Sequence, residues 1–354
     1  MGCERHPEGP HPGVFFRRGV RRVSDAEAEP ETDRDAADRD GASHDLAPLP
    51  VTEAADLVER VADNVSRVIV GNDAAVEHIL VTVLGRGHLL LEDVPGVGKT
   101  MLARALATSV DCEFKRVQFT PDLLPSDVTG INVYNQKTGE FEFRPGPVFA
   151  NIVLGDEINR APPKTQSALL EAMEEGQVTV DGVTRRLPDP FTVIATQNDV
   201  EPGRTYELPL AEIDRFMKKL RLGYPDRADE TEILSRTAGE HPIESLEPVA
   251  TTEELRRARA TVGEVGVSEP VREYVTDLAT YTREHAQLGV SPRGSIALVR
   301  ASQARAVIDG RDYVVPDDVQ TEARSVFAHR VRPRTGSESG LDVVEDALSS
   351  VTVE

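Results

Sequence analysis

The sequence has little of several residue types and patterns that mark particular protein classes. Its 354 residues include two cysteines, Cys3 and Cys112, which are too few for a disulfide framework and have no partner at metal-ligand spacing. No window approaches the roughly 18 consecutive apolar residues that would cross a bilayer. The first residues also lack the apolar segment of a secretory signal. We therefore expect no membrane span and a reducing, cytoplasmic location.

Lysine is scarce as well, and the charge balance is strongly acidic. Only six of the 40 basic residues are lysines, against 61 acidic residues and a formal net charge of −21. A highly acidic, lysine-poor surface is typical of proteins that stay soluble at high salt, so we expect a halophilic protein. Acidity also argues against nucleic-acid binding, because phosphate contacts supply most of that affinity, although a salt adaptation would weaken this argument.

The composition changes along the chain and predicts four segments. Residues 1–48 are acidic and almost without apolar periodicity, so we expect a disordered tail there. Residues 51–225 alternate apolar strand-like runs with helical stretches, which predicts an α/β domain with a parallel sheet. Residues 226–335 read as a small helical domain, and residues 336–354 as a flexible tail. The five expected strands cover 88–92, 114–118, 150–154, 191–196 and 217–222.

A phosphate-binding loop follows the first expected strand. The stretch 93–100 reads Asp-Val-Pro-Gly-Val-Gly-Lys-Thr and leads into a helical segment, so the loop has a strand before it and a helix after it. Gly96 and Gly98 would let backbone amides close around phosphates at the positive end of the helix. Lys99 would reach the β- and γ-phosphates, and the hydroxyl of Thr100 would ligate Mg²⁺. The sequence therefore predicts binding and hydrolysis of ATP.

Two later strands end in polar residues that suit the same reaction. The strand at 150–154 leads to Asp156 and Glu157, which we expect to hold Mg²⁺ and to polarise the attacking water, respectively. An acidic pair that only caps a helix is the structural alternative, and the upstream loop makes it the weaker one. Asn198 follows the strand at 191–196 and would help to position the water if that strand lies beside the loop-bearing one.

Over residues 65–335 the sequence resembles the MoxR-type AAA+ ATPases. The resemblance rests on LLLEDVPGVGKTMLARALA at 89–107, on FRPGPVFANIVLGDEINRAPPKTQSALLEAMEEGQVTVDG at 143–182, and on FTVIATQN at 191–198, LPLAEIDRF at 208–216 and SPRGS at 291–295. It implies a five-stranded parallel phosphate-loop sheet with a small C-terminal helical lid domain. Family members usually carry Gly at the position of Asp93 and Gln at that of Asn72, and we expect both changes to be tolerated.

The resemblance also assigns roles that the spacing of residues could not. It implies that Arg215 is an arginine finger inserted into the neighbouring subunit's site, and that Arg293 contacts the phosphates of its own subunit from the lid. It places Val70 and Gly71 beside the adenine. A finger that acts on a neighbour implies a homo-oligomeric ring, usually a hexamer. The expected nucleotide contacts are Val70, Gly71, Pro95, Gly96, Val97, Gly98, Lys99, Thr100 and Met101.

The family resemblance favours a chaperone-like ATPase that remodels a protein client. It implies work with proteins that carry a von Willebrand factor A domain, in some cases to insert a metal or cofactor. A nucleic-acid motor and a magnesium-chelatase-type motor subunit remain alternatives, because such relatives share hairpin insertions like those expected at 132–144 and 177–187. A scaffold that binds ATP without hydrolysing it would be expected to lack Glu157, Asn198 or Arg215, and all three are present.

Overall fold

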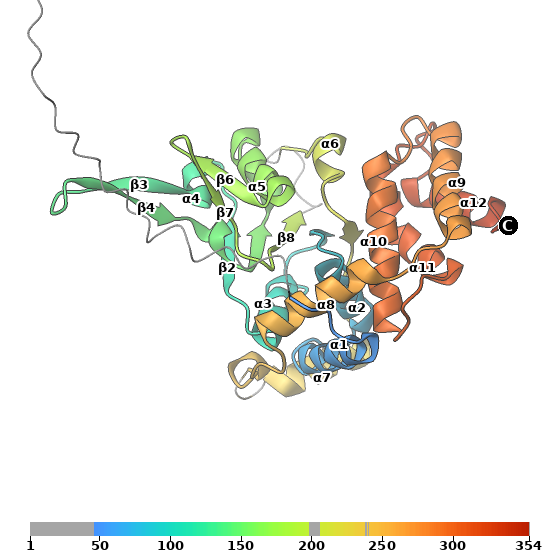
Figure 1. Ribbon diagram of the computed structural model, residues 1–354, viewed down its shortest axis with the longest axis horizontal. Coiled ribbons are helices and arrows are strands. Elements are labelled where there is room, and N and C mark those ends of the chain that lie inside the picture. The colour runs from blue at the N-terminus through green and yellow to red at the C-terminus, as the bar shows by residue number, and fades with distance from the viewer. Residues whose placement is uncertain (1–45, 198–205, 238, 240, 354) are drawn as a thin grey trace, which may run out of the picture. The chain divides into compact units, whose positions relative to one another are not determined.

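The computed structural model describes residues 46–197, 206–237, 239 and 241–353. The predicted disorder of residues 1–48 therefore falls almost entirely outside the described part. Five parallel strands form the central sheet in the order β2-β5-β8-β1-β9 (Figure 1). They are β1 Leu89–Glu92, β2 Phe114–Gln118, β5 Ile152–Asp156, β8 Thr192–Gln197 and β9 Lys218–Leu220. The predicted sheet is confirmed, and its order places the strand that leads to Asn198 beside the strand that leads to the phosphate loop.

Helices cover both faces of this sheet. The described α-helices are α1 Val51–Ser66, α2 Asp73–Leu84, α3 Lys99–Ser109, α4 Pro125–Thr129, α5 Pro163–Glu175, α6 Leu210–Ile213, α7 Arg227–Thr237, α8 Thr252–Glu264, α9 Glu269–His285, α10 Pro292–Ile308, α11 Pro316–Phe327 and α12 Gly340–Ser350. Successive strand residues face opposite sides, so Leu89 and Leu91 pack with α1, α2 and α3, whereas Leu90 packs with α4 and α5. Burial on both sides explains why β1, β5 and β8 read as largely apolar runs.

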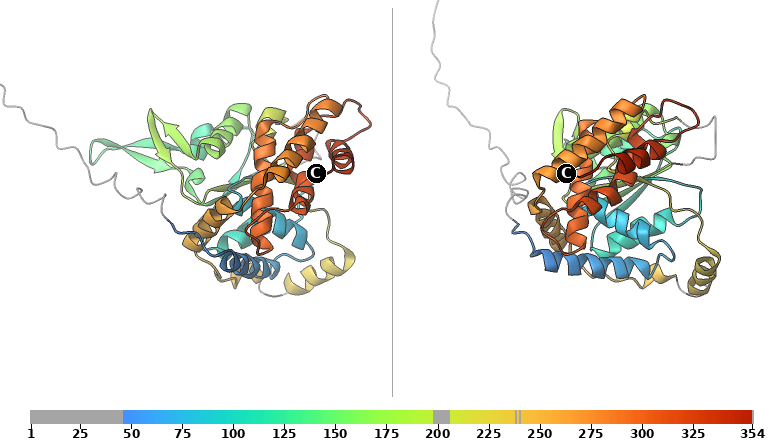
Figure 2. Two further views of the ribbon diagram at one scale, coloured as in Figure 1. Left: turned by 45° about the vertical axis from the view of Figure 1, so that its right-hand side comes forward. Right: turned by 90° about the vertical axis from the view of Figure 1, so that its right-hand side faces the viewer.

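Two hairpins extend from the sheet domain. Strands β3 Gly130–Asn135 and β4 Glu140–Pro145 form the longer one, and β6 Gln177–Val180 and β7 Val183–Arg186 form the other (Figures 1 and 2). Both match the predicted hairpin segments. The second turns at Asp181 and Gly182, which have φ angles of 52° and 81°, as a two-residue hairpin turn with the twist of the flanking strands requires.

The helical C-terminal part differs from the prediction at both ends. The described residues from 46 to 353 belong to one compact unit, in which α8 packs on α1 and α2 and shares their apolar core. The prediction of a flexible tail at 336–354 is wrong for α12, which buries Val343, Val344 and Ala347. Ser339 and Asp342 cap its first turn reciprocally, so a capping box and an apolar stripe stabilise this helix. Among the described residues, none of the helices is long and apolar enough to span a membrane.

Candidate nucleotide site

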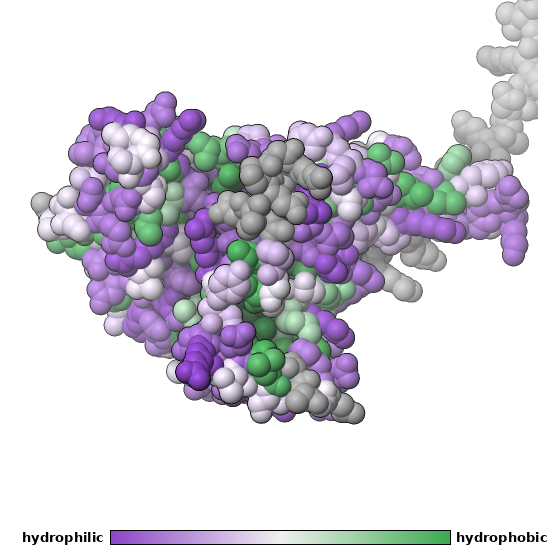
Figure 3. Space-filling model, turned by 180° about the vertical axis from the view of Figure 1, so that it is seen from behind, coloured by the Kyte–Doolittle hydropathy of each residue, from purple (hydrophilic) through white to green (hydrophobic). Residues whose placement is uncertain are grey.

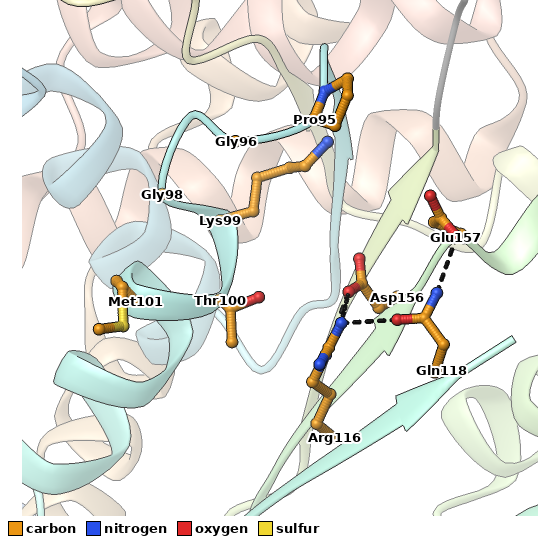
Figure 4. Close-up of a pocket in the computed structure, with 10 residues that line it drawn as sticks. All are labelled: Pro95, Gly96, Gly98, Lys99, Thr100, Met101, Arg116, Gln118, Asp156 and Glu157. Carbon is orange, nitrogen blue, oxygen red and sulfur yellow. Dashed lines mark hydrogen bonds and ion pairs between the residues drawn. The ribbon is translucent and has the colours of Figure 1, made fainter.

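The phosphate loop joins β1 to the first turn of α3 (Figure 4). Gly96 and Gly98 have φ angles of 89° and 91°, in the left-handed region that glycine enters without strain. The Nζ of Lys99 lies across the loop and donates to the carbonyl oxygens of Asp93 at 2.9 Å and Val94 at 3.3 Å. Burial lowers the pKa of the Lys99 ammonium, and nearby carboxylates, Asp93 among them, act in the opposite direction. The loop is therefore closed around the buried Lys99 ammonium.

Asp93 anchors the start of this loop. One carboxylate oxygen accepts from the backbone amide of Val94 at 2.9 Å. The other accepts from the amides of Leu222 at 2.6 Å and Gly223 at 2.8 Å, directly after β9. Asp93 is buried, and these three bonds satisfy its carboxylate. The residue thus links the phosphate loop to the end of the neighbouring strand.

Asp156 and Glu157 face the loop from the carboxyl end of β5. Together with Lys99, Thr100 and Met101 they line a cavity of about 310 Å³ (Figure 4). The Oδ1 of Asp156 accepts from the hydroxyl of Thr196 at 2.7 Å, and the same hydroxyl accepts from the amide of Glu157 at 2.8 Å. The structure therefore brings both predicted carboxylates to the phosphate loop, with orientations set by β8.

Two cavity residues escaped the sequence interpretation. Arg116 donates to the Oδ2 of Asp156 at 2.6 Å, and the Nε2 of Gln118 donates to the Oε2 of Glu157 at 2.8 Å (Figure 4). The sequence pattern that could have revealed them is a pair of polar residues two positions apart on β2. Side chains at this spacing lie on one face of the strand, and β2 pairs with β5 in the sheet. The predicted water-positioning residue Asn198 lies outside the described residues, and its role stays a prediction.

An apolar pocket of about 150 Å³ adjoins the phosphate cavity. Val70 lines it, and Gly96, Gly98 and Met101 border both spaces. Its wall is completed by Val68, Ile69, Asn72, Val97, Pro225, Ile233, Arg236, His241 and Pro242. Gly71 lies beside Val70 at the point where α7 approaches, and a Cβ at this position would lie 1.9 Å from the carboxylate of Asp229. The pocket has the size and apolar character that a nucleobase next to the phosphates would need.

The residues around the loop also fit a magnesium ion. Mg²⁺ prefers oxygen ligands and usually keeps several waters, so that one or two protein oxygens and the substrate phosphates complete its shell. Thr100 and Asp156 supply a hydroxyl and a carboxylate to the same cavity. The described residues contain no cluster of three or more His, Cys, Asp or Glu side chains that could hold a metal by themselves. Thr100 and Asp156 would leave the rest of a Mg²⁺ shell to waters and substrate phosphates, as this ion prefers.

The predicted finger, Arg215, lies at the other edge of the sheet. Its Nη1 donates to the carbonyl oxygen of Leu170 at 2.8 Å and lies 3.2 Å from the Oε2 of Glu174 on α5. It lines a pocket of about 220 Å³ with residues 86–88, which precede β1, and Met217, which precedes β9. The phosphate loop follows β1, so in a parallel sheet the two sites lie at opposite ends of the strands. Arg215 therefore lies at the end of the sheet opposite the phosphate loop of its own subunit.

Arg293 lies in this second pocket and not at the phosphate loop. It forms an ion pair with Glu174, the carboxylate that also holds Arg215. The expectation that Arg293 contacts the phosphates of its own subunit is wrong for this structure, because α10 presents it at the amino-terminal edge of the sheet. Arginines dominate the pocket even though the whole chain is acidic. They are Arg86, Arg215, Arg293, Arg300 and Arg330.

Comparisons with known proteins agree with this architecture. The family described as "ATPase family associated with various cellular activities (AAA)" matches residues 88–218, and the AAA lid domain matches residues 278–349. Protein YeaC of Bacillus subtilis is 55% identical over 277 residues, which cover 78% of this chain and 87% of YeaC. Chaperone MoxR1 of Mycobacterium tuberculosis is 42% identical over 77% of this chain and 75% of its own length.

A solved structure of a candidate ATPase from Cytophaga hutchinsonii has the same fold. It superposes with a TM-score of 0.81 at 37% sequence identity and covers 86% of this chain and 97% of that one. Identity at this level over nearly whole chains extends the likeness from the fold to the family. With its phosphate loop, its paired carboxylates and its lid, the chain is a nucleotide-binding ATPase that belongs to the MoxR-type AAA+ family.

Proposed function

We propose that the protein hydrolyses ATP in a ring of identical subunits, with each active site shared between two neighbours. The observation that carries this proposal is that Arg215 and Arg293 lie together at the edge of the sheet opposite Lys99. Neither arginine can serve the phosphate loop of its own subunit from there. A head-to-tail ring would bring this arginine-rich face against the next subunit's loop. The family resemblance favours six subunits.

In the proposed mechanism, residues of one subunit bind ATP and orient the water. Lys99 and the loop amides would hold the β- and γ-phosphates, and the apolar pocket at Val70 would hold the adenine. Thr100 and Asp156 would hold Mg²⁺, which when bound neutralises charge on the phosphates. Glu157 would polarise the attacking water, with its carboxylate oriented by Gln118.

The neighbouring subunit would supply positive charge in the transition state. Charge spreads over the phosphoryl oxygens during transfer, and an arginine aimed at them stabilises it. Glu174 holds Arg215 and Arg293 through separate carboxylate oxygens, so it would present both guanidinium groups from one point on α5. Hydrolysis would then depend on assembly of the ring.

Mixing two inactive variants tests the shared site. Glu157→Gln should still bind ATP but lose at least about 100-fold in turnover, because the general base is removed. Arg215→Ala should lose about 1,000-fold, because the finger is removed. Each variant retains what the other lacks, so co-assembled rings should regain hydrolysis at interfaces that combine an intact Glu157 with an intact Arg215. Phosphate release measures turnover, and native mass spectrometry confirms mixed rings. Mixed rings without recovered turnover would refute the shared site.

We further propose that the ring remodels a protein client in a salt-rich cytoplasm. The chaperone designation of the Mycobacterium tuberculosis relative supports a protein client. The family resemblance favours a client with a von Willebrand factor A domain, and metal or cofactor insertion as one purpose of remodelling. ATPase assays at high salt with such a protein, and separately with DNA, distinguish the options. Stimulation by DNA alone would contradict a protein client and favour a nucleic-acid motor.

A further inference from the structure

Arg330 is a buried cation, and four of its hydrogen bonds are directed at the finger loop, defined here as residues 214–217. It ends the short 3₁₀ helix η4, Ala328–Arg330, which follows α11, and only 5% of it is exposed. Burial lowers the pKa of the Arg330 guanidinium, and the proximity of Asp214 raises it, so a partner carboxylate compensates the buried charge. The residue lines the arginine-rich pocket, but its donors are bonded within the protein.

The hydrogen bonds of Arg330 hold the main chain on both sides of Arg215. Its Nε donates to the Oδ1 of Asp214 at 2.7 Å. Its Nη2 donates to the carbonyl oxygens of Asp214 at 2.9 Å and Phe216 at 2.6 Å. Its Nη1 donates to the carbonyl oxygen of Met217 at 3.2 Å. An ordinary buried ion pair would need only the first of these bonds, whereas the other three fix the path of the backbone.

The segment that carries Arg293 completes this arrangement. The hydroxyl of Ser291 donates to the Oδ2 of Asp214 at 2.9 Å, so both oxygens of this carboxylate are held from the C-terminal helices. A Cβ at Gly294 would lie 2.8 Å from the Cδ of Arg330, so a side chain there would press on the guanidinium stem. The finger loop is thus bound to the same helices that carry Arg293.

We propose that Arg330 is a positioning residue for the finger Arg215. By fixing the carbonyl groups before and after Arg215, it makes the C-terminal helices determine where the finger enters the neighbouring subunit's site. Arg330 does not touch the nucleotide. The proposal rests on the proposed function, because a finger needs a site shared between subunits.

Arg330→Lys provides the test because it keeps the charge but loses the planar fork. A lysine can bond Asp214, but it cannot span the carbonyl groups on both sides of Arg215. We expect turnover to fall about 100-fold, as expected when a reacting group is displaced by about 1 Å. Binding of a fluorescent ATP analogue should stay within about twofold, because the phosphate loop lies at the other edge of the sheet. Wild-type turnover in this variant would overturn the proposal.

Subunit mixing separates positioning of the finger from general support of the fold. Arg330→Lys retains an intact phosphate loop and Glu157, so mixing it with Glu157→Gln should restore hydrolysis. In a random equal mixture about a quarter of the interfaces of a ring would combine the two intact halves. Mixing Arg330→Lys with Arg215→Ala should restore nothing, because neither supplies a working finger. Recovery in this second mixture, or none in the first, would overturn the proposal.

Two further measurements keep the result interpretable. If the Arg215→Ala and Glu157→Gln pair also fails to recover in mixed rings, the shared site itself fails, and the role of Arg330 fails with it. Should Arg330→Lys not fold, Ser291→Ala replaces it, with Ser339→Ala as the matched control. Both serines cap a helix, but only Ser291 also binds Asp214. Ser291→Ala should lower turnover, and mixing it with Glu157→Gln subunits should restore hydrolysis, whereas Ser339→Ala should leave turnover unchanged. Equal effects of Ser291→Ala and Ser339→Ala on turnover would overturn the proposal.

Discussion

His88 illustrates how single residues in the interior are matched to their surroundings. It precedes β1, and both of its ring nitrogens have partners. The Nδ1 accepts from the amide of Val193 at 2.9 Å, and the Nε2 lies 3.0 Å from the carbonyl oxygen of Met173. The first contact requires an unprotonated nitrogen, so the ring is neutral with its proton on Nε2. Burial, with a contribution from Arg259, lowers the pKa of His88 to about 4.

The low pKa of His88 predicts a pH dependence of stability. Between about pH 6.5 and pH 4 the unfolded chain binds a proton that the folded chain does not. The free energy of unfolding should therefore fall as the pH decreases, with a contribution from this residue of up to about 1.4 kcal/mol per pH unit. His88→Gln can keep both hydrogen bonds without titrating, so its profile should be shallower. Chemical denaturation at several pH values measures this. Profiles of equal slope below pH 6.5 would contradict the prediction, while parallel profiles above pH 7 are the internal control.

At the scale of elements, β9 runs from the end of the sheet that carries Arg215 to the end that carries the phosphate loop. The finger loop precedes it, and the amides of Leu222 and Gly223 that bind Asp93 follow it. Lys218 and Lys219 in this strand and Arg221 just after it are basic, yet each has an acidic partner. Lys218 is fully buried and paired with Glu322 of α11, while Lys219 and Arg221 each lie 2.6 Å from Glu92. Ion pairs thus satisfy the basic residues of this segment, while the backbone of β9 pairs with β1.

Helix α12 gives a prediction about the stability of a whole element. Val344 is 1% exposed in the apolar core, and truncation to alanine removes two buried methyl groups. We expect Val344→Ala to lower the free energy of unfolding by about 1–3 kcal/mol. Val353→Ala is the matched control, because Val353 is 37% exposed and its truncation should change stability by less than about 0.5 kcal/mol. Denaturant titration measures both variants, and equal effects would mean that α12 does not contribute to the folded core.

For the whole molecule, the distribution of charge matters more than any single pair. The formal net charge is −21, and hydrophilic residues dominate the face in Figure 3. The arginine-rich pocket contrasts with this balance, since five arginines line it. Such a pocket would suit the proposed ring, because a nucleotide at the interface would bring negative charge to it.

The net charge predicts that salt stabilises the protein. Like charges repel in the folded state, and the screening length falls from about 10 Å at 0.1 M salt to about 3 Å at 1 M. The melting temperature should therefore rise between these KCl concentrations, and thermal scans measure it. Asp63→Asn is an informative variant, because Asp63 lies one turn after Glu59 on the exposed face of α1. It should respond less to salt than the wild type. A melting temperature that falls with KCl would contradict the halophilic interpretation.

The sequence by itself determined the features that local pattern fixes. The phosphate loop, the strands around it, the hairpin turn at Asp181 and the carboxylates Asp156 and Glu157 follow from residue types at short spacing. For the same reason, the family resemblance could be recognised from contiguous motifs. Arg215 was predicted as a finger from one of these motifs, although its partner Glu174 was not predicted.

Only the tertiary structure decided at which end of the sheet each arginine lies. The place of Arg293, the bonds of Arg330 to the finger loop, and the contact of Arg116 with Asp156 all join residues far apart in sequence. Such contacts depend on how α10 and the helices after it pack on the sheet. Local periodicity in the sequence does not predict that packing. The sequence could therefore predict candidate catalytic groups, whereas the packing of the helices determined which of them lie together in one subunit.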